Sequence, residues 1–138
     1  MSDLKLKIVS NHGTLLEQNV EMVVLPGYFG DIGITAGERV FVYLLKAGII
    51  YVFNSSGVSA RYFVFGGRFK LENDELVVAT EQQLIDLSKI DKEDINNKIQ
   101  TFEELKTKTD NKTLLENYEH TISAYKEALL SENTRLYK

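Results

Sequence analysis

The stretch that decides the fold is residues 24–37, VLPGYFGDIGITAG, which holds one proline and four glycines within fourteen positions. Glycine and proline interrupt regular elements, so the stretch predicts short strands separated by turns. Gly27, Gly30 and Gly33 superficially suggest a phosphate loop. However, no Gly-Lys-Ser/Thr follows them, and the G-x-G-x-x-G order is absent. We therefore interpret the stretch as a turn-rich edge of a β-sheet.

Working outward, glycine and proline are confined to the first part of the chain. All 9 glycines and the single proline precede Arg68, and none follows. This shift in composition predicts many turns first and long helices afterwards. The fold class that follows is an all-β domain plus an α-helical one. We expect a β-sandwich at residues 1–86 and a helical hairpin at residues 87–138.

The first domain shows the periodicity of strands. Residues 4–8, LKLKI, alternate apolar and polar side chains, as a half-buried strand does. Further β-rich runs lie at residues 21–25, 40–46, 49–53, 61–65 and 76–79. Turn signals separate them, at Pro26-Gly27, Ala36-Gly37, Ala47-Gly48, Asn54-Ser55-Ser56-Gly57, Gly66-Gly67 and Asn73-Asp74. Such spacing predicts a sandwich or a barrel of short strands. Of the two, we expect a sandwich of about ten strands.

The second domain shows the periodicity of helices. Asp91 can act as the N-cap of a helix at about residues 92–106, with Asp94 favoured by the helix dipole. Asp110 can cap a second helix that runs from about residue 111 to residue 138. Apolar residues recur at helical spacing in both, at Ile95, Ile99 and Phe102, and at Leu115, Tyr118, Ile122, Tyr125 and Leu129. The short break between the helices predicts antiparallel neighbours.

The composition narrows the functional classes. The chain is 43% hydrophobic with a net charge of −4, and it lacks a basic stripe, so nucleic-acid binding is not expected. It has no cysteine, and His12 and His120 lie far apart in the sequence. We expect no catalytic residue, no cofactor and no metal site, and therefore not an enzyme on its own.

Targeting signals are also missing from the sequence. No apolar run approaches the roughly 20 residues that span a bilayer, the longest being residues 40–45. The first residues, MSDLK, lack a basic region followed by an apolar core, so neither a secretory signal nor a transit peptide is expected.

Three motifs in order resemble the epsilon subunit of bacterial F-type ATP synthase, whose mitochondrial counterpart is called delta. Residues 24–37 resemble its first signature, and residues 62–69, YFVFGGRF, resemble its second. Residues 73–79, NDELVVA, match the hairpin that follows. The order of the elements and the chain length agree with the same family.

This resemblance implies a non-catalytic subunit of the central stalk of a proton-translocating ATP synthase. Such a subunit packs against the gamma subunit and the c-ring, and it couples rotation of the ring to ATP synthesis in the catalytic head. Its hairpin can lie folded or extended, and the extended form contacts the alpha and beta subunits and inhibits ATP hydrolysis. The implied location is peripheral, on the cytoplasmic face of the bacterial inner membrane.

Two candidate sites follow when the residues are considered together with the resemblance. A large apolar pair in a glycine-flanked turn indicates a contact surface, so the expected partner-binding residues toward gamma and the c-ring are Tyr28, Phe29, Asp31 and Glu38. Only the final turn of the second helix is locally basic and also apolar, so we expect a regulatory tip that comprises Arg135, Leu136 and Lys138.

Two departures from the family pattern change what we expect. Ala36 and Glu38 stand where the family usually carries Pro and His, which alters the expected ring contact. Residues 90–95, IDKEDI, keep the aspartate cap of a family ATP motif, but Asp94 stands where Arg belongs and Ile95 where Ala belongs. Because an acidic residue repels phosphate, no nucleotide binding is expected.

Two other readings remain open from the sequence. The chain could be an unrelated adaptor with a sandwich head and a helical tail, since fold does not settle function. It could also be a small β-sandwich enzyme or a sugar-binding domain. An adaptor would co-purify with other proteins, and an enzyme would show turnover as the isolated chain.

Overall fold

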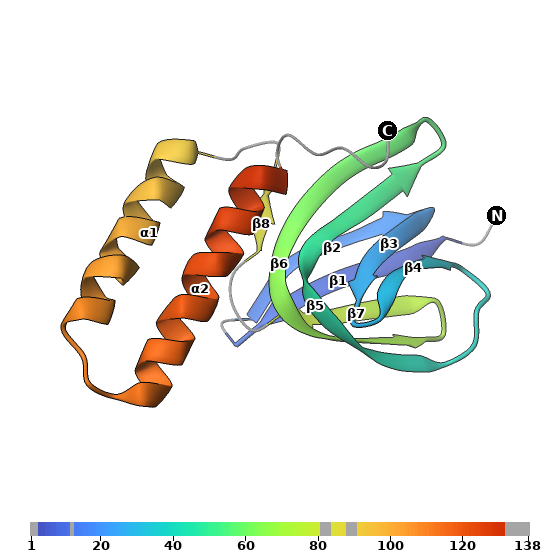
Figure 1. The fold of residues 1–138 in the computed structure, drawn as a ribbon. Coiled ribbons are helices and arrows are strands. Elements are labelled where there is room, and N and C mark those ends of the chain that lie inside the picture. Colours follow the sequence, from blue (N-terminus) through green and yellow to red (C-terminus); the bar gives the residue numbers. More distant parts are fainter. Residues whose placement is uncertain (1–2, 12, 81–83, 88–90, 132–138) are drawn as a thin grey trace. The chain divides into compact units, whose positions relative to one another are not determined.

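The computed structural model describes residues 3–11, 13–80, 84–87 and 91–131 (Figure 1). The chain divides into two compact units, one that contains the strands and one that contains the two helices. The domain boundary after residue 86 stays a prediction, because residues 88–90 lie outside the described part.

The β unit has eight strands in the described residues. They are β1 (Leu4–Ser10), β2 (Gly13–Val20), β3 (Met22–Gly27), β4 (Gly30–Thr35), β5 (Phe41–Asn54), β6 (Gly57–Glu72), β7 (Glu75–Thr80) and β8 (Ile85–Asp86). Their order in the sheet is β2-β1-β7-β6-β5-β3-β4, with β8 added to β6. The β1–β7 pair is parallel, and the other pairs are antiparallel. The predicted fold class, a β-sandwich followed by a helical hairpin, is confirmed.

The sandwich forms because β5 and β6 are long enough to serve both of its layers. The two strands pair from Phe41–Leu71 to Asn54–Gly57 and curve along their length (Figure 1). One end of this ribbon pairs with β7, and through it with β1 and β2. The other end pairs with β3 and β8. The core therefore lies between two halves of one bent sheet.

Two of the predicted turns are wrong. Ala47-Gly48 and Gly66-Gly67 lie inside β5 and β6, so the expected strands 40–46 and 49–53 are one long strand, and the expected strand 61–65 is part of another. The glycines bend the strands instead of ending them. Gly66 and Gly67 have φ of +105° and +139°, a region that side chains with a Cβ rarely adopt. A methyl group on Gly67 would also collide with the carbonyl of Ala79 on β7.

The core draws its side chains from both layers. In β1 the predicted alternation is confirmed, since Leu4, Leu6 and Ile8 are fully buried while Lys5 is exposed. The other buried members of the cluster are Val20, Val23, Leu25, Ile34, Leu45, Ile50, Val52, Tyr62, Val64, Phe69, Leu71, Leu76 and Val78. The inward side chains of β1, β3, β5, β6 and β7 thus supply most of the apolar burial that holds the sandwich.

The helical unit contains α1 (Lys92–Thr107) and α2 (Lys112–Ser131). The Asp91 cap is confirmed, because its carboxylate accepts a hydrogen bond of 3.1 Å from the backbone N–H of Asp94. The predicted cap at Asp110 is wrong by one residue. Asn111 directly precedes α2, and its side-chain oxygen accepts from the backbone N–H of Leu114 at 3.2 Å.

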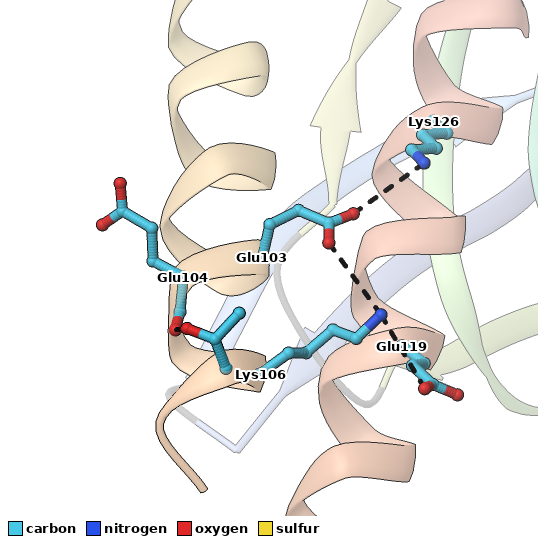
Figure 2. A network of polar contacts seen from close by, with 6 residues as sticks. Glu103, Glu104, Lys106, Glu119 and Lys126 are labelled. Carbon is cyan, nitrogen blue, oxygen red and sulfur yellow. Dashed lines mark hydrogen bonds and ion pairs between the residues drawn. The ribbon is translucent and has the colours of Figure 1, made fainter.

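Aromatic packing and ion pairs join α1 to α2. Phe102 of α1 lies against Tyr118 and Tyr125 of α2, with ring centroids 5.8 and 6.2 Å apart. Along one edge, Lys106 lies 3.7 Å from Glu119, and Lys126 lies 4.0 Å from Glu103 (Figure 2). The hairpin thus has an aromatic contact next to an edge of opposite charges.

Replacing each of the two candidate N-cap residues by alanine tests where α2 begins. We expect Asn111→Ala to destabilise the helical unit by about 1 kcal/mol, because an N-cap oxygen satisfies an otherwise unpaired backbone N–H. Asp110→Ala is the matched control and should change stability by less than about 0.5 kcal/mol. Urea unfolding followed by far-UV circular dichroism measures both. A larger loss for the Asp110 variant would restore the sequence-based assignment.

Candidate docking surface

The β3–β4 hairpin presents two aromatic side chains at its tip. Gly27 and Gly30 pair across the strands, which leaves Tyr28 and Phe29 as the two-residue loop. Tyr28 is 58% exposed and Phe29 is 85% exposed, and their rings meet edge to face at 5.0 Å. The two aromatic residues singled out from the sequence therefore stand at one exposed point.

A second exposed apolar segment lies at the start of β5. Val40, Val42 and Leu44 are 64%, 60% and 59% exposed. Of the alternate residues, Tyr43 packs against the core cluster and Leu45 belongs to it, whereas Phe41 stacks on Tyr43 and stays 40% exposed. The sequence reasoning missed this segment, because an apolar run does not show which side is buried. The signal present was the lack of polar alternation in residues 40–45, since a strand with one wet face normally alternates.

The two apolar segments adjoin. The backbone N–H of Tyr28 donates a 3.0 Å hydrogen bond to the carbonyl of Leu44, and Gly27 lies opposite Leu45 in the sheet. We call the joint feature the apolar docking surface, and it consists of Tyr28, Phe29, Val40, Val42 and Leu44. Neighbouring exposed apolar side chains of this kind mark sites of protein contact.

Basic side chains border the apolar docking surface. Leu44 lies opposite Arg68 on β6, and Val42 lies opposite Lys70. Both cations are exposed, and Lys70 forms a 2.9 Å ion pair with Glu72. An apolar centre with a charged rim is the usual anatomy of a protein–protein interface. Lys70 also lines a surface hollow of about 400 Å³ with Glu72, Asn73, Glu75 and Val77.

The two predicted acidic residues lie in different settings. Asp31 is exposed on β4, next to the aromatic tip and opposite Pro26. Glu38 lies in the β4–β5 connection, where its Oε1 accepts from the backbone N–H of Thr35 at 2.9 Å and from its hydroxyl at 3.2 Å. Glu38 therefore closes a local turn. Whether either acid contacts a partner stays a prediction.

The remaining predicted residues, Arg135, Leu136 and Lys138, lie outside the described part of the chain.

Within the described part, no group of three or more His, Asp or Glu side chains could hold a metal ion. No helix of the described residues is long and apolar enough to span a bilayer. His12 also falls outside the described residues.

The resolved pKa shifts have structural causes. Burial, and then the nearby charge of Asp86, raise the pKa of Tyr62. On the solvent side of β1, the 2.7 Å ion pair of Lys5 with Glu17 raises the pKa of the ammonium and lowers that of the carboxyl.

Comparisons with known proteins point to one family. The family model for the β-sandwich domain of the ATP synthase delta/epsilon chain matches residues 3–84. An ATP synthase epsilon chain of Granulibacter bethesdensis is 32% identical over 82 residues, which are 59% of this chain and 61% of the relative. The epsilon chain of Pelagibacter ubique is 31% identical over 103 residues, which are 74% of this chain and 78% of the relative.

Solved structures share the fold. A chain of the Euglena gracilis mitochondrial ATP synthase, in a structure of OSCP, F1 and c-ring, superposes with a TM-score of 0.71 at 17% identity. That superposition covers 95% of this chain and 82% of the Euglena chain.

The sequence alignments cover a smaller part of the relatives. This chain spans 61% of the length of the Granulibacter epsilon chain and 63% of the length of one from Campylobacter fetus.

The fold and the exposed surface define a class of protein: a β-sandwich joined to a helical hairpin, with an apolar docking surface on the sandwich. Within that class, the chain belongs to the family of ATP synthase delta and epsilon chains, because the family model matches more than half of its residues. The resemblance drawn from its three motifs is thereby confirmed.

Proposed function

We propose that this chain is a non-catalytic subunit in the central stalk of a proton-translocating F-type ATP synthase. There it couples rotation of the c-ring to ATP synthesis in the catalytic head. The observation that carries the proposal is the apolar docking surface on the sandwich of a family member, at the loop where sequence reasoning expected partner contacts. The partners are the gamma subunit and the c-ring.

The architecture suits this mechanical role. Transmitting torque requires a stiff body that does not deform between two contacts. The β5–β6 ribbon runs through both halves of the sheet, and close-packed interiors transmit strain. A docking surface fixed to that ribbon would pass force into the whole sandwich.

The same proposal assigns location and regulation. The chain would be held at the cytoplasmic face of the bacterial inner membrane through its complex. The helical hairpin would act as the regulatory element, with transient contacts to the alpha and beta subunits. Such regulation requires a second docking state of similar free energy.

Truncating the aromatic tip tests the docking surface. Tyr28→Ala/Phe29→Ala should weaken ATP-driven proton pumping in membranes several-fold, because truncating aromatic anchors at interfaces often costs about 2 kcal/mol or more. The isolated variant should still fold, since both side chains are exposed. Leu15→Ala is the control, because Leu15 is an exposed apolar residue on β2.

Undiminished pumping by a correctly assembled double variant would contradict this docking role. A pull-down with the full chain separates the proposal from an unrelated adaptor. The proposal requires the gamma subunit to co-purify at one copy per complex, whereas an adaptor would retain other proteins.

The start of α1 tests for nucleotide binding. Asp94 forms a 3.2 Å ion pair with Lys98, and Asp91 caps the helix, so carboxylates occupy this terminus. We expect no ATP binding by the full chain at millimolar concentration, because these charges repel phosphate. Calorimetry and chemical-shift mapping measure it. A saturable shift confined to residues 90–130 would contradict the expectation.

The end of the chain tests the inhibitory mechanism. Between residues 110 and 138 the chain carries four cationic and five anionic side chains, which gives no broad attraction to an acidic partner. Deleting residues 135–138, the predicted regulatory tip, should relieve most of any inhibition of ATP hydrolysis. Raising the salt concentration should relieve little, because salt does not screen packing contacts.

ATP hydrolysis by the reconstituted head, with the full chain or the truncation, measures both effects across a salt series. Strong salt sensitivity together with an inert truncation would show that charges along the helix body hold the inhibited state instead.

A further inference from the structure

The turn between β6 and β7 is held rigidly from two directions. Asn73 and Asp74 form its two-residue loop with φ of +52° and +61°, a left-handed conformation that Asn and Asp tolerate better than most residues. The carbonyl of Asp74 also accepts a 2.8 Å hydrogen bond from the backbone N–H of Lys5 on β1. The turn is therefore fixed to the sheet on its own strands and on a third one.

From this fixed turn, the side chain of Asp74 reaches a segment 37 positions earlier in the sequence. Its Oδ1 accepts a 2.6 Å hydrogen bond from the backbone N–H of Gly37, which lies in the β4–β5 connection with φ of +87°. A carboxylate acceptor makes such a bond shorter and stronger than a neutral one. The bond therefore ties the connection to the turn.

The two hydrogen bonds in the connection have different consequences. The bond from Thr35 to Glu38 joins residues three apart, so it shapes the turn without placing it on the sheet. The hydrogen bond from Gly37 to Asp74 does fix the position of the connection relative to the sheet. Val40, which is 64% exposed, ends this connection directly before β5, whereas Val42 and Leu44 are already paired with β6.

We propose that Asp74 is a positioning residue for the apolar docking surface. Its carboxylate holds the connection at Gly37, so that Val40 lies in line with Val42 and Leu44 and the surface meets a partner subunit preformed. A connection without this tie would have to be ordered during docking, and ordering opposes association. The inference rests on the proposed docking function, but the tie itself can be measured in the free chain.

A matched pair of substitutions isolates the side-chain hydrogen bond. Asp74→Gly removes the carboxylate that accepts the hydrogen bond, and glycine adopts a φ of +61° without steric cost. Asp74→Asn keeps an acceptor oxygen and also tolerates that conformation. Each variant of the full chain is examined by amide hydrogen exchange, by thermal unfolding, and by affinity for a reconstituted head and ring that lacks this subunit.

We expect the Gly37 amide to exchange about tenfold faster in Asp74→Gly and at nearly the native rate in Asp74→Asn. Affinity should fall about three- to tenfold in Asp74→Gly alone, the scale of one lost hydrogen bond to a charged group. The Asp74→Gly melting temperature should stay within a few degrees of the native value, which separates positioning from a loss of fold.

A double-mutant cycle adds a readout that a purely structural role would not move. In a Val40→Ala background, Asp74→Gly should cost less affinity than in the native chain, because the Val40 side chain that Asp74 positions has already been removed. Full additivity of the two losses would overturn the positioning role. Native affinity in Asp74→Gly would overturn it as well.

The remaining outcomes separate this inference from the proposed function. An unchanged exchange rate at Gly37 in Asp74→Gly would show that the tie does not hold the connection, whatever the binding. If the native chain fails to bind the complex, the proposed function fails, and with it the docking role of Asp74. The exchange data would then report only whether the tie exists.

Discussion

The pairing of β5 with β6 is the constraint on which the rest of the sandwich depends. It runs from Phe41–Leu71 to Asn54–Gly57 and passes through both halves of the bent sheet. The bend needs glycine, because Gly66 and Gly67 adopt positive φ and a side chain on Gly67 would collide with β7. If the ribbon could not bend, the inward faces of β1 and β3 would have no apolar surface to meet.

The same ribbon explains why apolar residues reach the solvent. At the start of β5, one side supplies Tyr43 and Leu45 to the core, and the other carries Val42 and Leu44. A strand whose only task was folding would carry polar residues on that outer side. Exposed apolar side chains favour association, so their presence beside the aromatic tip is better explained by docking than by the stability of the sandwich.

Local features of the fold could be predicted from the sequence. The alternation in residues 4–8 gave the buried face of β1, and Asp91 stood directly before an amphipathic helix, so both assignments held. The turn at Gly66-Gly67 was predicted wrongly because glycine marks a bend inside a strand as readily as it marks an end. Only the pairing with β5 and β7 distinguishes the two cases.

In the candidate site, Tyr28 and Phe29 could be found because a large apolar pair at a glycine-flanked turn has no core to enter. The bond from Gly37 to Asp74 spans 37 positions and depends on how two separate turns meet, which no local pattern encodes.

In the helical hairpin, aromatic packing and ion pairs contribute unequally to stability. Its inter-helix ion pairs, at 3.7 and 4.0 Å between partly exposed side chains, contribute about 0–1 kcal/mol each. In proteins most helical stability comes from tertiary packing and not from intrinsic propensity, so packing has to hold these helices of 16 and 20 residues together. The contact of Phe102 with Tyr118 and Tyr125 therefore stabilises the hairpin more than the ion pairs do. Under the proposed function, the hairpin has to exchange one docking state for another of similar free energy, and apolar contacts permit this because they are not directional.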